Sequence, residues 1–164
     1  MNLTIILIIC VIIVAFYIFY RLRPVKKTKS DDLYNKGLNC LLKGDNMGAL
    51  VLFRQVVKQN SNHINAYLQI GNILRKENPE QAAKIHQSLT VRFNLPISTQ
   101  IDIHQALALD YQEMKRLDLA SYEAEQVLRL ENKNIWGIEF LIDIAEKTEN
   151  WDMASELAKK FQKY

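Results

Sequence analysis

The chain has 164 residues, enough for one domain and an appended segment, and its five Gly and three Pro favour long helices over a turn-rich sheet protein. Its formal net charge of +3 is unevenly distributed, because five of the 21 Lys and Arg residues lie within residues 21–30 and 16 remain to face 18 Asp and Glu residues elsewhere. Most of the chain is thus mildly acidic, and its composition gives no support for nucleic-acid binding.

The first predicted element is a transmembrane helix at residues 1–20, because residues 3–20 form an apolar run in which only Thr4 is polar. A helix of this length rises about 27 Å, close to the hydrocarbon thickness of a bilayer. Aromatic residues crowd its C-terminal end, and a basic juxtamembrane linker follows at 21–30. By the positive-inside rule, the remainder of the chain should lie in the cytoplasm. The residues expected to hold the anchor against membrane lipid are Phe16, Tyr17, Tyr20, Arg21 and Arg23.

A cleaved signal peptide is the competing interpretation of this run. It would require a basic region at the N-terminus, a shorter apolar core and a small-residue cleavage site. Residues 1–2 carry no charged side chain, and no such cleavage site follows the run. The sequence therefore favours an uncleaved anchor.

The rest of the chain repeats with a period near 34 residues, the length of a tetratricopeptide unit. Gly37 and Gly71 are 34 residues apart, and so are Ala120 and Ala154. In such a unit, a small residue on the first helix (helix A) lets the second helix (helix B) approach closely. We therefore predict an all-α chain with an α-solenoid of about four tetratricopeptide-type helix pairs at residues 31–164. The predicted repeats lie near 30–63, 64–97, 101–134 and 135–164.

Two turns between helices depart from the regular period. At the turn within the second repeat, Asn78 is expected to cap a helix whose first residue is Pro79. An insertion at 93–96 lengthens the next turn, and Ser98 is the expected cap of the helix that follows. A single four-helix bundle would account for the helices, but it would leave the regular spacing of Gly and Ala unexplained.

No pattern of catalytic or metal-binding residues is present in the sequence. It has no CxxC pair, P-loop or nucleophile elbow, and Cys10 and Cys40 are not expected to form a disulfide. His86 stands where a packed aromatic residue is usual, so we expect a core histidine with one satisfied ring nitrogen. The sequence thus predicts a protein that is not an enzyme and has no cofactor and no metal.

The candidate site is the groove that helices A would line, where protein partners could bind. Asn and Arg side chains can hold a peptide backbone or carboxylate, while aromatic and leucine side chains can supply anchor pockets. The predicted groove residues are Tyr34, Leu38, Asn72, Arg75, Lys76, Gln105 and Leu109, with Gln112, Trp136, Phe140 and Asp143 as further candidates. Trp136 and Trp151 are more simply explained as packing residues.

Three segments of the repeats have distinctive sequences: GLNCLLKGDNMGALVLF at 37–53, IGNILRK with QAAKIHQSL within 70–89, and ALALDYQEMKRLDLA at 106–120. Together with the order of anchor, basic linker and repeats, they resemble the lipopolysaccharide assembly protein B family of Gram-negative bacteria. Members of that family are longer and end in a rubredoxin-like domain with two CxxC pairs. The later repeats and that domain are missing from these 164 residues.

This resemblance implies a single-pass adaptor of the bacterial inner membrane with its repeats in the cytoplasm. Such an adaptor places the lipid A deacetylase under the control of a membrane-bound AAA+ protease and so regulates lipopolysaccharide synthesis. Two alternatives stay open. One is a membrane-tethered repeat scaffold for an envelope complex, and the other is a co-chaperone clamp that uses Lys36, Asn39, Asn72 and Arg75 to hold an acidic C-terminus.

Overall fold

The computed structural model describes residues 3–21 and 29–161, with side chains described at 9–19 and 29–159. All regular secondary structure in this part of the chain is helical. The predicted anchor at 1–20 coincides with helix α1 (Leu3–Arg21), whereas Arg23 and most of the predicted linker lie outside the described residues, as do the side chains of Tyr20 and Arg21. By length and hydropathy, no helix within the described residues qualifies as a membrane span.

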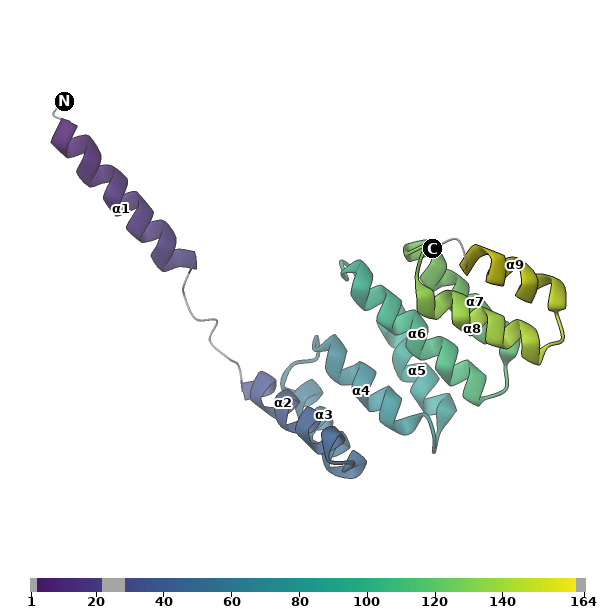
Figure 1. Cartoon of the computed structure of the whole chain (residues 1–164). Coiled ribbons are helices and arrows are strands. Elements are labelled where there is room, and N and C mark those ends of the chain that lie inside the picture. Colours follow the sequence, from purple (N-terminus) through teal and green to yellow (C-terminus); the bar gives the residue numbers. More distant parts are fainter. Residues whose placement is uncertain (1–2, 22–28, 162–164) are drawn as a thin grey trace.

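The remaining helices form four antiparallel pairs that stack side by side in a curved row (Figure 1). Each helix packs mainly against the helix before it and the helix after it, as in a solenoid. The first two pairs are α2 (Lys29–Leu42) with α3 (Asn46–Gln59), and α4 (Ile64–Leu74) with α5 (Pro79–Thr90). The next two are α6 (Ile97–Glu113) with α7 (Leu117–Leu130), and α8 (Ile135–Lys147) with α9 (Trp151–Phe161).

The start of α5 confirms the predicted turn in the second repeat. The side chain of Asn78 accepts a hydrogen bond of 3.0 Å from the backbone N–H of Gln81, and Pro79 is the first helical residue. Because proline has no N–H to leave unpaired at this position, it begins a helix without loss. Asp45 caps α3 in the same way, through a 2.8 Å bond from the N–H of Gly48.

The start of α6 differs from the prediction, since Ser98 lies inside the helix and does not cap it. The N-cap residue is Pro96, whose extended backbone (φ −54°, ψ 148°) leads directly into Ile97, and no side chain caps this helix. The preceding turn passes through Asn94 with φ 57°, a conformation that Asn tolerates better than most residues. The third helix pair therefore begins four residues earlier than the predicted repeat at 101.

Close approach between the two helices of a pair explains the spacing of the small residues. A Cβ atom on Gly37 would lie 2.6 Å from Cε1 of Phe53, and one on Gly71 would lie 2.3 Å from Nε2 of His86. Neither distance leaves room for a methyl group, so helix A must carry glycine wherever a large ring projects from helix B. In the third pair the same role falls to Ala108, which is fully buried.

The core runs along the row as three clusters of buried side chains. Ala154 and Ala158 on α9 are only partly buried, but four other alanines on helices B have no exposed surface, as the repeat pattern predicted, and they let successive helices pack closely. These alanines are Ala49, Ala82, Ala120 and Ala124. In the last pair, Trp136 stacks on Phe140 with ring centroids 4.8 Å apart, which confirms it as a packing residue. Trp151, in contrast, is 64% exposed, so its predicted packing role is wrong.

Candidate functional site

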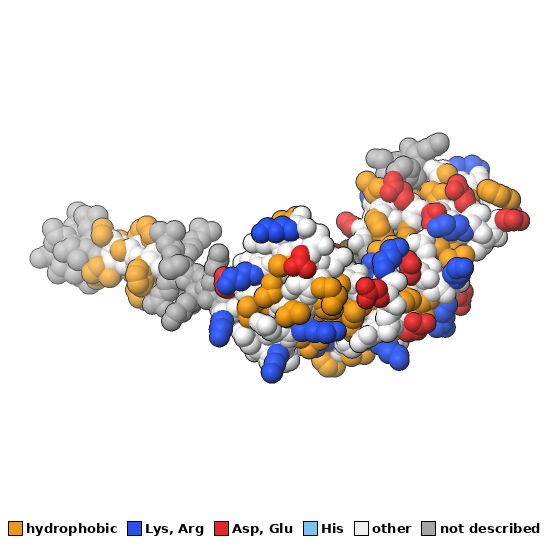
Figure 2. All heavy atoms as spheres, turned by 90° about the horizontal axis from the view of Figure 1, so that it is seen from below, with side chains coloured by type: hydrophobic (Ala, Val, Ile, Leu, Met, Phe, Trp, Pro, Cys, Tyr) orange, Lys and Arg blue, Asp and Glu red, His pale blue; other side chains and the backbone are white. Residues whose placement is uncertain are grey.

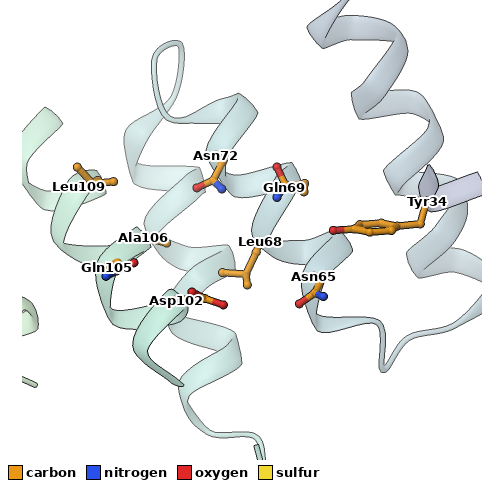
Figure 3. A pocket seen from close by; sticks show the side chains of 9 residues that line it. All are labelled: Tyr34, Asn65, Leu68, Gln69, Asn72, Asp102, Gln105, Ala106 and Leu109. Carbon is orange, nitrogen blue, oxygen red and sulfur yellow. The ribbon is translucent and has the colours of Figure 1, made fainter. Parts of the chain in front are cut away.

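Helices α2, α4 and α6, the first helices of three successive pairs, line a groove on one face of the solenoid (Figure 3). Because each is the first helix of its pair, the repeat brings equivalent faces of all three helices to the same side. The lining residues are Tyr34, Asn65, Leu68, Gln69, Asn72, Asp102, Gln105, Ala106 and Leu109. Leu68 and Ala106 are almost fully buried and form an apolar floor beneath the polar side chains.

Amide side chains dominate the polar lining of the groove. Asn65, Gln69 and Asn72 are spaced four and three residues apart, so they share one face of α4, and Gln105 lies across from them on α6. Each amide group offers both a donor and an acceptor. This is the combination that pairs with backbone N–H and C=O groups, so the groove is suited to a polypeptide segment.

Tyr34 closes the groove on the side of α2, and its phenol group points across towards α4 in Figure 3. The ring is held between His63 and Phe53, with centroid distances of 4.6 and 5.4 Å. Burial raises the pKa of the Tyr34 phenol, so the hydroxyl stays protonated at neutral pH. It can therefore donate or accept a hydrogen bond at a fixed position.

Asp102 supplies the charge of the groove, since it is the one ionisable group besides Tyr34 among the residues that line it. Desolvation raises the pKa of this carboxyl above the ordinary value of 3.8. At neutral pH the groove is thus mildly negative, and it offers no cation to an acidic ligand. On the solenoid face drawn in Figure 2, basic and acidic side chains are interspersed, which gives no continuous basic track for a nucleic-acid backbone there.

The structure brings four of the predicted groove residues together and places three elsewhere. Tyr34, Asn72, Gln105 and Leu109 line the groove, while Leu38 packs against the first core cluster and Lys76 forms a 3.0 Å ion pair with Glu113 outside the groove. The third residue outside the groove is Arg75, which forms hydrogen bonds with other residues of the chain. Sequence reasoning missed five of the lining residues: Asn65, Leu68, Gln69, Asp102 and Ala106.

The guanidinium group of Arg75 joins α4 to α6. Its Nε atom donates to Oδ1 of Asp110 at 2.6 Å, and one terminal nitrogen donates to the carbonyl of Ala106 at 3.2 Å and to Oδ1 of Asn72 at 2.7 Å. The last bond turns the Asn72 amide so that its oxygen is occupied and its nitrogen remains as a donor. Arg75 thus orients Asn72, a groove residue, although it does not line the groove itself.

The second oxygen of Asp110 contacts His86, and both of these side chains are fully buried. Nδ1 of His86 lies 2.5 Å from Oδ2 of Asp110, and Nε2 lies 3.2 Å from the carbonyl oxygen of Leu68. A carbonyl oxygen can only accept, so Nε2 carries a hydrogen and a single proton lies between Nδ1 and the carboxylate. Both ring nitrogens are therefore satisfied, which corrects the prediction of one.

The further candidates from the third and fourth repeats are not among the residues that line the groove. Gln112 donates to Asp143 at 3.0 Å, so these two polar side chains pair with each other. Phe140 is only 8% exposed and belongs to the third core cluster. Both observations assign these residues to packing between α6 and α8.

Comparisons with known proteins agree with this fold. No protein-family model matches the chain. Lipopolysaccharide assembly protein B of Escherichia coli strain K12 is 26% identical over 148 residues, which cover 86% of this chain and 38% of that protein. The same protein of Escherichia coli O157:H7 matches with the same values. The chain thus spans about two fifths of the length of the curated relatives that it matches.

Two solved structures share the arrangement of helices. MamA 41-end from Desulfovibrio magneticus RS-1 has a TM-score of 0.71 at 19% identity, covering 82% of this chain and 75% of that chain. The MamA RS-1 ArsTM double mutant has a TM-score of 0.72 at 20% identity, covering 84% and 76%. At these identities the likeness is one of fold, a tetratricopeptide-type α-solenoid. The chain is therefore similar to lipopolysaccharide assembly protein B over most of its own length, as its sequence motifs predicted.

Proposed function

We propose that the chain is a membrane-anchored adaptor that binds a polypeptide segment in the groove between α2, α4 and α6. The observation that carries this proposal is the lining of amide side chains over an apolar floor, with one carboxylate and a half-buried tyrosine at its sides. Amides can pair with a peptide backbone whatever its sequence, while the floor accepts an apolar side chain. The site supplies recognition, and no chemical step is assigned to it.

The anchor is proposed from α1. Its large described side chains are apolar and about half exposed or more, from Ile18 at 48% to Phe16 at 67%, and α1 lies apart from the repeat helices (Figure 1). A helix that is apolar all round is normally buried in a bilayer or a protein core. With the basic residues that follow it, this helix supports a single-pass inner-membrane protein whose repeats lie in the cytoplasm.

The biological setting is proposed from the curated relatives, whose name links them to lipopolysaccharide assembly. We infer that the chain serves the same process by bringing a membrane-bound AAA+ protease and the lipid A deacetylase together. This assignment is supported by the similarity over 86% of the chain. A membrane-tethered scaffold for another envelope complex would have the same fold and the same groove.

Photo-crosslinking of the intact, detergent-solubilised chain tests the proposal. A photoreactive residue is placed at Asn72 or Gln105 in the groove, and at Gln55 on the exposed surface of α3 as a control. Adducts to the protease or the deacetylase at the two groove positions, and not at Gln55, are the expected result. Adducts to other envelope proteins alone would replace the adaptor by a scaffold, while equal labelling at Gln55 would remove the groove as the binding site.

A further inference from the structure

The turn between α5 and α6 displays three large apolar side chains to solvent. Val91 is 73% exposed, Phe93 is 91% exposed and Ile97 is 60% exposed. Leu95, in the same turn, points inward and packs against the second core cluster. Hydrophobic side chains gathered this way at an exposed turn are typical of a contact with another protein or with a membrane.

Contacts within the protein hold this turn in place. Arg92 donates to the carbonyl of Ser61 at 2.9 Å and to Oδ1 of Asn62 at 3.2 Å, and its guanidinium group lies 5.2 Å from the centre of the Tyr67 ring. These bonds tie the turn to the neighbouring turn between α3 and α4. These contacts hold the turn in a defined conformation. The exposure of Phe93 therefore follows from the fold.

The position of this turn in the solenoid points to the partner. In a row of antiparallel helix pairs, the connections α3–α4, α5–α6 and α7–α8 lie on one edge, together with the first turn of α2 (Figure 1). The chain enters α2 at Lys29, so the edge that bears Phe93 is also the edge to which α1 is connected. Eight residue steps separate Arg21 from Lys29, so even a fully extended connection spans roughly 25–30 Å.

The extended length between Arg21 and Lys29 is comparable with the distance from α2 to α6 along the edge. Neighbouring packed helices are about 8–10 Å apart, so α2 and α6 are separated by on the order of 20–30 Å. When α1 is held in a bilayer, this edge of the first repeats cannot move far from the membrane surface. The opposite edge, which carries the turns within each helix pair, lies a helix length farther away.

The charges on this edge suit an anionic surface. Lys58 and Arg129 lie in the last turns of α3 and α7, and Lys133 lies in the turn between α7 and α8. Glu131 and the acidic residues at 31–32 offset part of this charge. Counted with Lys29 and Arg92, the described residues of these turns include five cations and three carboxylates, and one of the cations, Arg129, pairs with Glu125 at 3.9 Å. Anionic lipid headgroups attract such a distribution.

We propose that the α5–α6 turn is a second membrane contact, in which Phe93, Val91 and Ile97 enter the interfacial region of an anionic bilayer. This inference rests on the proposed anchor. The contact would fix the solenoid in one orientation, so that its axis runs along the membrane and the groove opens beside the surface. A polypeptide in the groove would then be held at a constant height above the lipid headgroups.

Lipid photo-crosslinking with the full chain tests this proposal. The chain is reconstituted into vesicles of phosphatidylethanolamine and phosphatidylglycerol, with benzoylphenylalanine in place of Phe93. The matched control places the same residue at Leu42, which is 85% exposed but lies at the opposite edge, and a third variant places it at Phe16 in α1. Mass spectrometry then identifies lipid adducts of each variant. Several-fold more lipid adduct at position 93 than at position 42 is the expected result.

The other outcomes separate this proposal from the anchor. Lipid adducts at position 16 with none at position 93 would overturn the second contact and leave the anchor intact. Failure of the chain to float with the vesicles, with no lipid adduct at position 16, would overturn both. An adduct at position 93 to a protein, or to a second copy of the chain, would identify the turn as a protein interface and also overturn the membrane contact.

Discussion

Nδ1 of His86 on α5 lies 2.5 Å from Oδ2 of Asp110 on α6, and neither side chain has exposed surface. The other oxygen of Asp110 accepts a hydrogen bond from Arg75, the C-cap residue of α4, so a single carboxylate joins three consecutive helices. The same network reaches the groove, because Arg75 also holds the Asn72 amide. The side chains that fix the packing between the second and third repeats therefore also set the geometry of the binding surface.

The first prediction concerns this carboxylate. Replacing Asp110 by Ala should lower the free energy of unfolding by about 3–5 kcal/mol, because it leaves Nδ1 of the buried His86 and Nε of Arg75 without their partner. Urea unfolding of the detergent-solubilised chain, followed by far-UV circular dichroism, measures this change. The substitution should also release Asn72 and weaken crosslinking from the groove.

A matched substitution at the surface controls for charge alone. Asp32 pairs with Lys36 at 2.7 Å, but both side chains are more than half exposed. Asp32→Ala should therefore cost about 1 kcal/mol or less. If Asp110→Ala has an equally small effect, the network is not what joins the three helices.

The fold was readable from the sequence because its determinants repeat along the chain. The alternation of small and large residues that places Gly37 against Phe53 recurs at Gly71, so one period predicts the next. Capping at Asn78 is a local signal and was equally readable. Ser98 was misjudged because Pro96 fixes the backbone two residues earlier, and no pattern of polar residues reveals which of two neighbouring signals begins a helix.

The site was only half predicted, because its residues depend on contacts between repeats. Asn72 and Gln105 were found from their position one turn away from the core face. Arg75 has the same sequence position relative to the core, but Asp110, 35 residues later, draws it away from the groove. Asp110 gives no signal of its own, since an acidic residue in a helix is ordinarily exposed.

The second prediction tests the fit between Gly37 and Phe53. Gly37→Ala should destabilise the chain by about 1–3 kcal/mol, because the added Cβ would lie 2.6 Å from Cε1 of Phe53. In the double variant with Phe53→Leu, the smaller side chain should make room, so the combined loss should be less than the sum of the single losses. Urea unfolding of the four proteins gives this coupling.

Gln55→Ala on the exposed surface of α3 is the control for this cycle, and it should change stability by no more than about 0.5 kcal/mol. If the losses in unfolding free energy of Gly37→Ala and Phe53→Leu were strictly additive, the two residues would not be energetically coupled. The close approach of α2 and α3 would then need another explanation.

The third prediction concerns pH. Desolvation raises the pKa of Asp102 in the folded chain, so the fold retains this proton to a higher pH than the unfolded chain does. The free energy of unfolding should therefore decrease as pH rises from the ordinary value of 3.8 through the raised pKa. The change should be small, since the carboxyl is largely exposed. Asp102→Asn should remove it, as seen by comparing urea midpoints across this range.

Direct titration of the Asp102 carboxyl by carbon-detected NMR separates this group from the other acids. Asp32, an exposed aspartate paired with Lys36, serves as the reference in the same spectra. A titration of Asp102 at or below 3.8 would contradict desolvation as the dominant effect. It would also mean that the groove is more open to water than its lining suggests.

The fourth prediction separates an adaptor groove from a co-chaperone clamp. The cations that such a clamp would use are already paired: Lys36 with Asp32 at 2.7 Å, and Arg75 with Asp110 at 2.6 Å. Because the groove itself presents the carboxylate of Asp102, an acidic C-terminal peptide would meet repulsion there. Fluorescence anisotropy should show no saturable binding of such a peptide. Saturable binding that Lys36→Ala or Arg75→Ala abolishes would establish the clamp and remove the argument from groove charge.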